Sequence, residues 1–309
     1  MWALRGWLSG LRLLGLALVL GAGCRAPTLI VDDAIRGPNG KTRLVAGVER
    51  EPVLAMGKDL EHVRVRFFVS EREVGDTKSD DEGVADIERA LDAEVGQFEA
   101  RAVVDGRELR AAGRVFAWDR QRVSIAVDID HTIAQTEYED LLDNDQEEGS
   151  DPLKRSVSTL RRLAADFQIL YLTGRPRSLL DKTRAWLRER EFPAGPVITA
   201  ESVRQMLRPG AFKQQKLRSL RKAWPRLLIG IGNTVSDAEA YGASEMLTLI
   251  LSKEPGRDFG RHALVFKDWK ALGRFFEANR DVLLDAERLK DAIEGKVMLL
   301  QTVPRYEER

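Results

Sequence analysis

The segment SIAVDIDHT places two aspartates, Asp128 and Asp130, directly after a short apolar run. Polar residues also follow two other apolar runs: Thr173 follows QILYL, and Asn233 and Asp237 follow LLIGIG. If these runs are neighbouring strands of a parallel sheet, their polar ends lie at one rim, where such sheets bind ligands. Carboxylates that gather at one place need a cation, and oxygen ligands favour a hard ion such as Mg²⁺.

The residue types at this rim suit phosphoryl transfer. An aspartate can take up the phosphoryl group itself and divide one difficult displacement into two easier steps, which makes Asp128 the candidate nucleophile. Asp130 can protonate the leaving alkoxide and later accept a proton from the attacking water. The Thr173 hydroxyl and the backbone N–H of Gly174 can bind phosphate oxygens. Lys213 heads the apolar stripe of a predicted helix, from which it reaches either solvent or a phosphate bound at the site.

Simpler structural roles exist for several of these residues. The aspartate pair, taken alone, suits a turn or a helix N-cap, and Asn233 or Asp237 can cap the helix that follows. Arg175, which comes after Gly174, either meets an anionic substrate or lines the surface. Because three strand ends converge, we favour the chemical interpretation over these roles.

The elements that must position this rim begin after Trp118, where apolar runs alternate with helix-length segments. We expect strands in RVSIAVDID, FQILYLTG, PVITA, RLLIGIGN and MLTLIL, and helices in LKRSVSTLRRLAAD, RSLLDKTRAWLRER, FKQQKLRSLRKAW and SDAEAYGAS. Continuous apolar strands that alternate with helices predict an α/β fold, in which helices cover both faces of a parallel sheet.

The same residues carry a resemblance to a known superfamily. DIDHT, LTGR, Lys213 and GNTVSD look like the four signature motifs of the haloacid dehalogenase (HAD) superfamily of phosphohydrolases, in the same order. The segment FKQQKLRSLRKAWPRLLIGIGNTVSDAEAY further resembles the lipin-type (LNS2) domain and is similar to App1-type phosphatidate phosphatases. The resemblance covers the chain from Val123 to Leu251. It implies a HAD-like Rossmannoid three-layer sheet and a Mg²⁺-dependent phosphatase.

The resemblance also implies which residues hold the metal. Asp128 would bind Mg²⁺ through a carboxylate oxygen, Asp130 through its backbone carbonyl and Asp237 through its carboxylate. Many members of the superfamily have an acid at the position of Asn233, whereas lipin-like members have an asparagine there. A water ligand would complete the metal-binding set.

An acidic segment, EYEDLLDNDQEEGSD, separates the first motif from the next predicted helix. Many HAD enzymes insert a cap domain at this point. Because this segment is too short for a sizeable folded cap, we expect a capless, open site that accepts a large or membrane-embedded substrate.

Residues 1–23 are typical of a bacterial export signal, with basic residues before a short apolar run and small residues after it. The run is shorter than the roughly 20 residues of a membrane-spanning helix. LGAGC resembles a lipobox, which implies that Cys24, the only cysteine, carries a lipid anchor. A plain secretory signal with an incidental cysteine is the alternative. We expect a lipid-anchored, periplasm-facing protein of the cell envelope, at the outer membrane because Arg25 replaces the aspartate that retains inner-membrane lipoproteins.

The region before the α/β segment contains no catalytic constellation. Residues 24–118 have short alternating strands with Gly and Asp turns, which predicts an antiparallel β-sandwich, loosely similar to bacterial immunoglobulin-like modules. Residues 119–280 hold the phosphatase-like domain, including an amphipathic helix in DWKALGRFFEANRDVLL. Residues 281–309 form a helical tail, AERLKDAIEGKVMLL, that packs, dimerises or lies on a membrane.

Composition narrows the functional classes. The chain has 309 residues with 49 basic and 49 acidic side chains, so the charge balance does not suggest a nucleic-acid partner. Lipid anchoring and an open site favour phosphatidate or another lipid phosphate as the substrate. Two alternatives remain: a phosphatase for a soluble phosphomonoester or phosphoprotein, and a non-catalytic module that binds phosphatidic acid. Asp130 argues against the second, because the lipin-type domains that only bind lack this acid/base aspartate.

Overall fold

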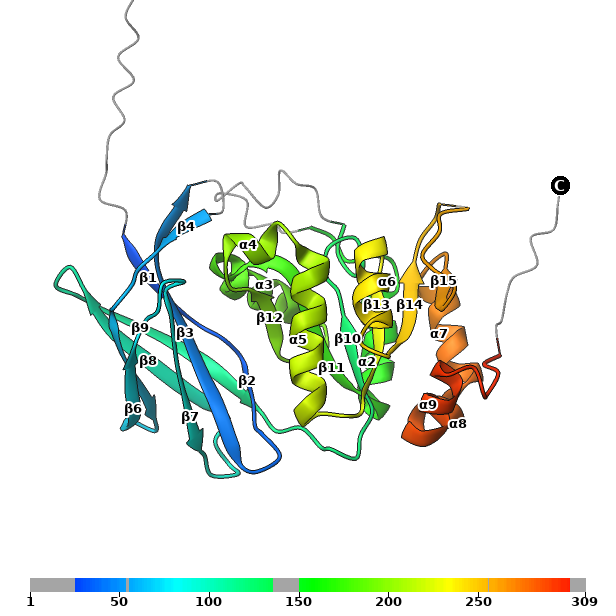
Figure 1. Ribbon diagram of the computed structural model, residues 1–309, viewed down its shortest axis with the longest axis horizontal. Helices are drawn as coiled ribbons and strands as arrows, with labels where there is room; N and C mark the ends of the chain where they lie inside the picture. Colours follow the sequence, from blue (N-terminus) through cyan, green and yellow to red (C-terminus); the bar gives the residue numbers. More distant parts are fainter. Residues whose placement is uncertain (1–25, 54–55, 136–149, 255, 301–309) are drawn as a thin grey trace, which may run out of the picture.

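The computed structural model describes residues 26–53, 56–135, 150–254 and 256–300 (Figure 1). The predicted export signal with Cys24, and most of the acidic segment, residues 136–149, lie outside the described residues. Two regions of different architecture follow each other along the described chain. Residues up to Phe116 form strands and turns, and residues from Ser124 onward form alternating strands and helices.

The first region consists of two β-sheets that enclose one hydrophobic core. In one sheet the long strand β3 pairs with β1, β4 and β7, and the other has the order β2-β9-β8-β5-β6. The strands are β1 (Pro27–Val31), β2 (Ala34–Ile35), β3 (Lys41–Val53), β4 (Met56–Asp59), β5 (Arg64–Val69), β6 (Arg72–Lys78), β7 (Val84–Ala90), β8 (Gln97–Val104) and β9 (Arg107–Phe116). We call this region the β-sandwich.

Apolar and polar residues alternate along the strands of the β-sandwich, so that the apolar side chains of each strand point into its core. In β5, Val65 and Phe67 are fully buried, whereas Arg64 between the turn and Val65 is exposed. Leu44 of β3 and Ala100 of β8 complete the centre of the same cluster. One pairing departs from the predicted antiparallel sandwich: β2 runs parallel to β9, because the chain crosses from one sheet to the other directly after β1.

A six-stranded parallel sheet forms the second region, in the order β12-β11-β10-β13-β14-β15. Its strands are β10 (Ser124–Val127), β11 (Gln168–Pro176), β12 (Val197–Ala200), β13 (Leu227–Gly232), β14 (Leu247–Leu251) and β15 (Ala263–Phe266). The central strand β10 pairs in parallel with β11 on one side and β13 on the other. The carboxyl ends of these three strands therefore lie side by side.

Helices cover both faces of this sheet (Figure 1). They are α2 (Ser156–Asp166), the 3₁₀ turn η1 (Arg177–Leu179), α3 (Leu180–Glu189), α4 (Val203–Met206), α5 (Pro209–Ala223), α6 (Val235–Gly242), α7 (Trp269–Ala278), α8 (Arg280–Leu284) and α9 (Ala286–Ile293). Side chains of α2, α3, α7, α8 and α9 pack in the core on one face, and those of α5 and α6 pack on the other.

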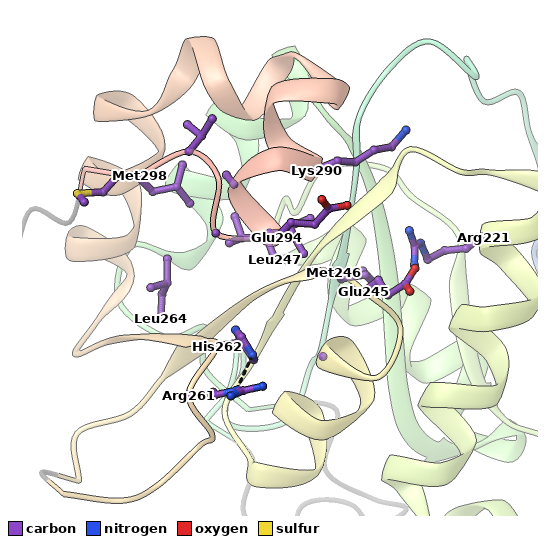
Figure 2. A pocket seen from close by; sticks show the side chains of 16 residues that line it. Arg221, Glu245, Met246, Leu247, Arg261, His262, Leu264, Lys290, Glu294 and Met298 are labelled. Atoms are coloured by element: carbon purple, nitrogen blue, oxygen red, sulfur yellow. Dashed lines mark hydrogen bonds and ion pairs between the residues drawn. The ribbon is translucent and has the colours of Figure 1, made fainter.

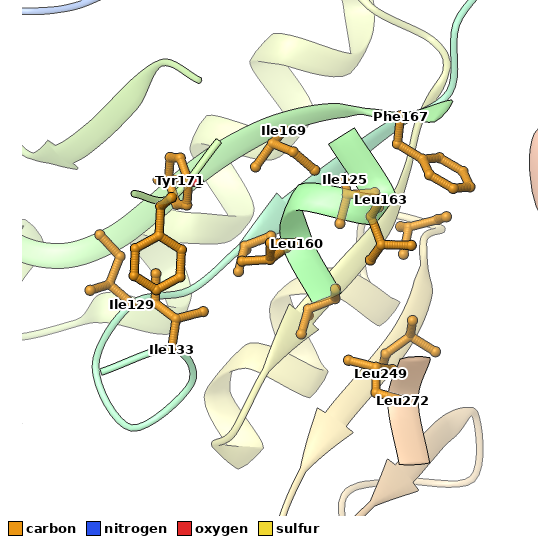
Figure 3. Close-up of a cluster of buried hydrophobic side chains, with 14 of the residues drawn as sticks. Ile125, Ile129, Ile133, Leu160, Leu163, Phe167, Ile169, Tyr171, Leu249 and Leu272 are labelled. Atoms are coloured by element: carbon orange, nitrogen blue, oxygen red, sulfur yellow. The ribbon is translucent and has the colours of Figure 1, made fainter. Parts of the chain in front are cut away.

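Burial on both faces explains why the strands are continuously apolar. On one face, Ile125 and Ile169 of the sheet pack with Leu160 of α2 and Leu272 of α7 (Figure 3). On the other, Ala126 belongs to a cluster with Phe212 and Leu217 of α5 and Tyr241 of α6. All four residues of β10 are buried, so this strand can present polar groups only beyond its end.

The C-terminal helices belong to the same core as the sheet. Leu283 of α8 and Leu289 of α9 lie in the cluster that contains Ile125. Helix α9 ends at Ile293, earlier than the sequence pattern predicts, and Gly295 follows it with a φ of 79°. Of the three possibilities for this segment, the described part packs on the domain. The helices within the described residues are all too short or too polar to span a bilayer.

Two aspartates in the link between β1 and β2 join the β-sandwich to the α/β region. The Asp32 carboxylate accepts hydrogen bonds from Arg177 of η1, with both N–O distances at 3.1 Å. The Asp33 carboxylate accepts from Arg184 of α3 at 2.8 Å and from the backbone N–H of Val197 at 2.8 Å. The β-sandwich is thus tied to the segment that follows β11 as well as to α3 and β12.

Candidate active site

The candidate nucleophile lies where the central strand ends. The backbone N–H of Asp128 donates to the carbonyl of Ile231 in β13 at 2.9 Å, so the sheet holds this residue in register. The turn that follows is anchored by Trp269 of α7, whose indole N–H donates to the Thr132 carbonyl at 2.7 Å. The Asp128 side chain is 7% exposed, so its carboxylate is almost entirely shielded from water.

Lys213 joins the first and last predicted motifs. Its ammonium group lies 2.5 Å from Oδ1 of Asp128 and 2.6 Å from Oδ1 of Asp237, and all three side chains are buried. Helix α5 directs Lys213 inward because its neighbours Phe212 and Leu217 bury the same side of the helix. Of the two possibilities for this lysine, the structure places it at the site rather than in solvent.

The charges in this cluster do not balance. Two buried carboxylates face a single ammonium group, with Asp130 nearby. Burial, Asp237 and Asp130 raise the pKa of Asp128 above its usual range, although Lys213 opposes the shift. Burial alone would also raise the pKa of Asp237, but Lys213 and Thr234 together hold it below its usual range. The cluster therefore favours a further positive charge close to Asp128.

Asp237 has a structural role in addition to its contact with Lys213. Its Oδ2 accepts from the backbone N–H of Thr234 at 3.0 Å, and the Thr234 hydroxyl accepts from the Asp237 N–H at 3.1 Å, which forms a capping box at the start of α6. Oδ2 also accepts from the backbone N–H of Asn233 at 3.1 Å. Capping was one of the two roles that the sequence left open, and here Asp237 combines it with the ion pair.

Two glycines allow α6 to approach β13 closely enough for these contacts. A Cβ on Gly232 would lie 2.6 Å from the Asp237 Cβ. A Cβ on Gly230 would lie 2.3 Å from the ring of Tyr241, which packs beneath the cluster. Larger residues at these positions would push α6 and its carboxylate away from Lys213.

A buried hydroxyl brings Asn233 and Asp128 together. The Thr132 hydroxyl lies 3.1 Å from Asp128 Oδ2 and 3.0 Å from Asn233 Oδ1, and Thr132 itself is fully buried. The Asn233 amide oxygen and the second Asp128 oxygen thus lie within reach of one common point. Thr132 was not among the predicted site residues, although its spacing of four residues from Asp128 across a turn was the available signal.

Asp130 faces the end of the neighbouring strand β11. Its carboxylate accepts from Arg175, with distances of 2.7 Å from Nη2 and 3.1 Å from Nε to the same oxygen, and from the Thr173 hydroxyl at 3.3 Å. The Asp130 side chain is 27% exposed, so a substrate or water can reach it. Thr173, predicted to bind phosphate, here contacts the candidate acid/base. Arg175 is part of the site and not a surface residue.

Gly174 lies where β11 meets the start of α5. A Cβ at this position would lie 3.1 Å from Pro209, the first residue of α5. The next backbone N–H, that of Arg175, donates to the Thr173 hydroxyl at 3.2 Å. The predicted phosphate-binding residues of β11 therefore lie beside the N-terminal end of the helix that carries Lys213, where a helix favours anions.

The donor set at this rim fits a hard divalent cation. Asp128 Oδ2 and Asn233 Oδ1 converge on the Thr132 hydroxyl, both are oxygen ligands, and the buried charge is negative. Among the described residues, no group of three His, Cys, Asp or Glu side chains is arranged as a metal site. A cation here would thus depend on Asp128, Asn233 and backbone or water oxygens, while Asp237 already uses both oxygens on Lys213 and the cap.

A separate cavity of about 630 Å³ opens between β14, α9 and the C-terminal segment (Figure 2). Apolar residues such as Leu264 and Met298 line it together with Lys290. Arg261 donates to the Nε2 atom of His262 at 2.8 Å across one side. The cavity includes the amino-terminal end of β14, whereas the predicted site residues lie at the carboxyl ends of the strands, and none of them lines it.

A family model matches the part of the chain that holds the site. Residues 125–248 match the LNS2 domain of the PITM 1-3 type. This segment runs from β10 to the beginning of β14 and includes Asp128, Lys213 and Asp237. The match supports the resemblance of this region to LNS2 domains and HAD-like phosphatases. The predicted lipoprotein signal lies outside the matched residues.

No curated protein matches the chain. Among solved structures, the M1 domain from titin is 15% identical, with a TM-score of 0.22 over 30% of this chain and 94% of that domain. A carbohydrate acetylesterase from Xanthomonas citri is 12% identical, with a TM-score of 0.28 over 71% of this chain and 65% of the esterase. TM-scores this low do not establish a common fold.

Proposed function

We propose that this chain is a Mg²⁺-dependent phosphatase that hydrolyses a phosphomonoester through an aspartyl-phosphate, on a HAD-like α/β fold. The observation that carries the proposal is the buried cluster of Asp128, Lys213 and Asp237 at the end of the central strand, with Asp130 beside it. A buried carboxylate held by a lysine is suited to attack phosphorus, because its orientation is fixed and Lys213 opposes the rise in its pKa that burial causes.

The two aspartates then act in sequence. An oxygen of Asp128 forms a bond to phosphorus while the bond from phosphorus to the alcohol breaks, and Asp130 gives a proton to the departing alkoxide. In the second step Asp130 takes a proton from water, the water oxygen bonds to phosphorus, and the bond to Asp128 breaks to release phosphate. Exposure agrees with these roles, since Asp130 is 27% exposed and Asp128 is 7% exposed.

The residues around the aspartates would hold the phosphoryl group and the metal. Lys213 orients the Asp128 carboxylate and favours its ionised form, and the Thr173 hydroxyl with the N–H of Gly174 would bind phosphate oxygens. Asp128, Asn233 and the Asp130 carbonyl would hold Mg²⁺. Bound Mg²⁺ would supply the positive charge that the buried carboxylates and the phosphoryl oxygens require.

We further propose phosphatidate or another lipid phosphate as the substrate. Leu207, between α4 and α5, is 78% exposed and is flanked by the exposed residues Arg204 and Arg208. It lies two residues before Pro209, the neighbour of Gly174. In Figure 1, β1 begins at the same end of the molecule as α4, so an anchor on Cys24 would bring this rim to a membrane. An apolar side chain beside basic ones suits an anionic lipid surface.

Hydrolysis of a panel of lipid and soluble phosphomonoesters by the full chain tests the proposal. We expect activity with Mg²⁺, loss of activity with a chelator, and loss of at least about 10³-fold in Asp128→Asn, because the nucleophile is removed. Full activity of Asp128→Asn, or activity that ignores the chelator, would contradict the mechanism. A preference for sugar phosphates or phosphopeptides would contradict only the lipid assignment, and phosphatidate binding without turnover would make the chain a binding module.

A further inference from the structure

The candidate acid/base aspartate is oriented by an arginine. Arg175 Nε lies 3.1 Å from each of the two Asp130 carboxylate oxygens, and Nη2 lies 2.7 Å from Oδ1. The planar guanidinium group matches a carboxylate in this geometry, and so fixes the plane of the carboxylate as well as its position. The Arg175 side chain is 10% exposed and also donates to the Thr183 hydroxyl of α3 at 3.2 Å.

The backbone that carries Arg175 is held from the other side by the β-sandwich. Only Pro176 separates Arg175 from Arg177, the first residue of η1. The Arg177 side chain is 5% exposed and forms a two-pronged ion pair with Asp32, which follows β1. The same strand segment thus has one arginine that binds the acid/base aspartate and another that binds the β-sandwich.

A glycine of the β-sandwich leaves room for the Arg177 side chain. Gly47 of β3 lies against its side chain, and a Cβ on this glycine would lie 2.6 Å from Arg177 Cδ and 2.8 Å from Nη1. The absence of a side chain at position 47 allows the arginine to cross the strand and reach Asp32. Loss of the ion pair between Arg177 and Asp32 would destabilise the folded protein, because a buried guanidinium group would be left without this partner.

We propose that the β-sandwich is a positioning support for the acid/base aspartate. Asp32 and Gly47 fix Arg177, the rigid Pro176 link transmits this position to Arg175, and Arg175 holds the Asp130 carboxylate toward the leaving group. The inference rests on the proposed phosphatase function. It gives the β-sandwich a role in the proton transfer step rather than in binding a ligand, and makes Asp32, Arg175 and Arg177 positioning residues.

Substrates with different leaving groups distinguish this positioning role from a general loss of structure. An alkyl phosphomonoester needs a proton on its departing oxygen, whereas the phenolate of p-nitrophenyl phosphate departs without one. A displaced Asp130 should therefore slow formation of the aspartyl-phosphate from the first substrate and spare its formation from the second. The ratio kcat/KM reports this step, whereas kcat also includes the attack of water, which needs Asp130 with either substrate. We expect Asp32→Asn to lower kcat/KM for the alkyl substrate at least about tenfold, and to change kcat/KM for p-nitrophenyl phosphate less than about twofold.

Asp33→Asn is the matched control. Asp33 lies next to Asp32, and its substitution weakens the same interface, but it releases Arg184, Val197 and Arg114 of β9 instead of η1. We expect it to affect the two substrates equally. Gly47→Ala, which alters no charge, should reproduce the selective loss of Asp32→Asn, and Arg175→Lys should show a larger loss of the same kind, because lysine cannot form the fork.

Both outcomes of the comparison are decisive once folding is checked by thermal unfolding. If Asp32→Asn and Gly47→Ala are folded and reduce kcat/KM equally for both substrates, or for neither, the positioning role is overturned while the phosphatase function stands. If Asp32→Asn does not fold, Gly47→Ala alone decides. A wild-type chain that hydrolyses neither substrate contradicts the proposed function, and this inference with it.

Discussion

At the scale of single residues, Lys213 is the group on which the buried carboxylates depend. Its ammonium group is the only cation in contact with Asp128 and Asp237 among the described residues, with distances of 2.5 and 2.6 Å. Removal of one partner from a buried ion pair leaves an uncompensated charge, which typically costs about 3–5 kcal/mol. The same residue therefore couples the stability of the domain to the orientation of its candidate nucleophile.

We expect Lys213→Met to lower the free energy of unfolding by about 3 kcal/mol in the presence of a chelator, because two buried carboxylates then repel each other. Urea denaturation measures the change. Lys222→Met is the control, since Lys222 is exposed on the same helix and its loss should change stability by less than about 0.5 kcal/mol. The double variant Asp128→Asn/Lys213→Met should recover part of the loss. No recovery would contradict the electrostatic explanation.

Glu49 is a half-buried acid on β3, close to Arg177. Its Oε1 atom is buried and has no hydrogen-bond partner among the described residues. Burial raises the pKa of Glu49 from 4.5 to about 7, Arg177 opposes the shift, and Asp59 adds to it. Because the folded protein holds this proton more tightly than the unfolded chain, Glu49 lowers stability as the pH rises from about 4.5 to about 7.

We expect Glu49→Gln to remove this loss of stability at higher pH. The variant should be more stable than the wild type by on the order of 1 kcal/mol at pH 8, and the difference should vanish near pH 4, where the wild-type carboxyl is protonated in both states. Urea denaturation across this pH range measures both effects. Glu88→Gln, at an exposed acid of the neighbouring strand β7, is the control variant. A constant difference at all pH values would argue against titration of Glu49.

The sequence pattern was sufficient for residues at strand ends but not for residues at contacts between regions. Asp128, Asp130 and Asp237 could be predicted because parallel strands carry their polar ends to one edge. Asp32 could not, because its significance depends on an arginine that lies 145 residues further along the chain. The role of Arg175 could not be decided from the sequence for a similar reason. Its place after Gly174 agrees with a surface position as well as with a position in the site.

At the scale of elements, the close approach of α6 to β13 is the feature that places Asp237. We expect Gly230→Ala to destabilise the domain by about 1–3 kcal/mol, because the added methyl group would collide with Tyr241. Gly242→Ala, in α6, has nothing within 4 Å of the added group and should change stability by less than about 1 kcal/mol, in the stabilising direction. Thermal unfolding compares the two. Equal effects would show that the close packing of α6 is not limiting.

Most elements of the α/β region follow from periodicity, and the exceptions have local causes. The strand β15 was not predicted, because none of its four residues is fully buried and its pattern is brief. The helix α5 begins at Pro209, before the predicted start, because proline suits the first turn of a helix. The parallel pairing of β2 with β9 involves two residues of β2, too few to leave a periodic signal.

At the scale of the whole molecule, the direction in which the site faces bears on its substrate. We expect Leu207→Asp to reduce hydrolysis of phosphatidate in anionic vesicles about three- to tenfold, because insertion of this side chain contributes on the order of 1 kcal/mol or more. Hydrolysis of a soluble phosphomonoester should not change. Val265→Asp is the control, since Val265 is 50% exposed on the edge strand β15. Equal activity of Leu207→Asp and wild type on vesicles would contradict a lipid-facing rim.

The central position of β10 has a consequence for the time at which the protein acquires its chemistry. Asp128 precedes Lys213 by 85 residues, and Asp237 comes 24 residues after that lysine. A growing chain therefore completes the entire β-sandwich, and then the nucleophile, long before the strand and helices that surround the nucleophile exist. Since domains fold largely in the order of their synthesis, the support is built first and activity comes last. We expect a nascent chain that stops short of α5 to be inactive, because it contains Asp128 and Asp130 without Lys213 and Asp237.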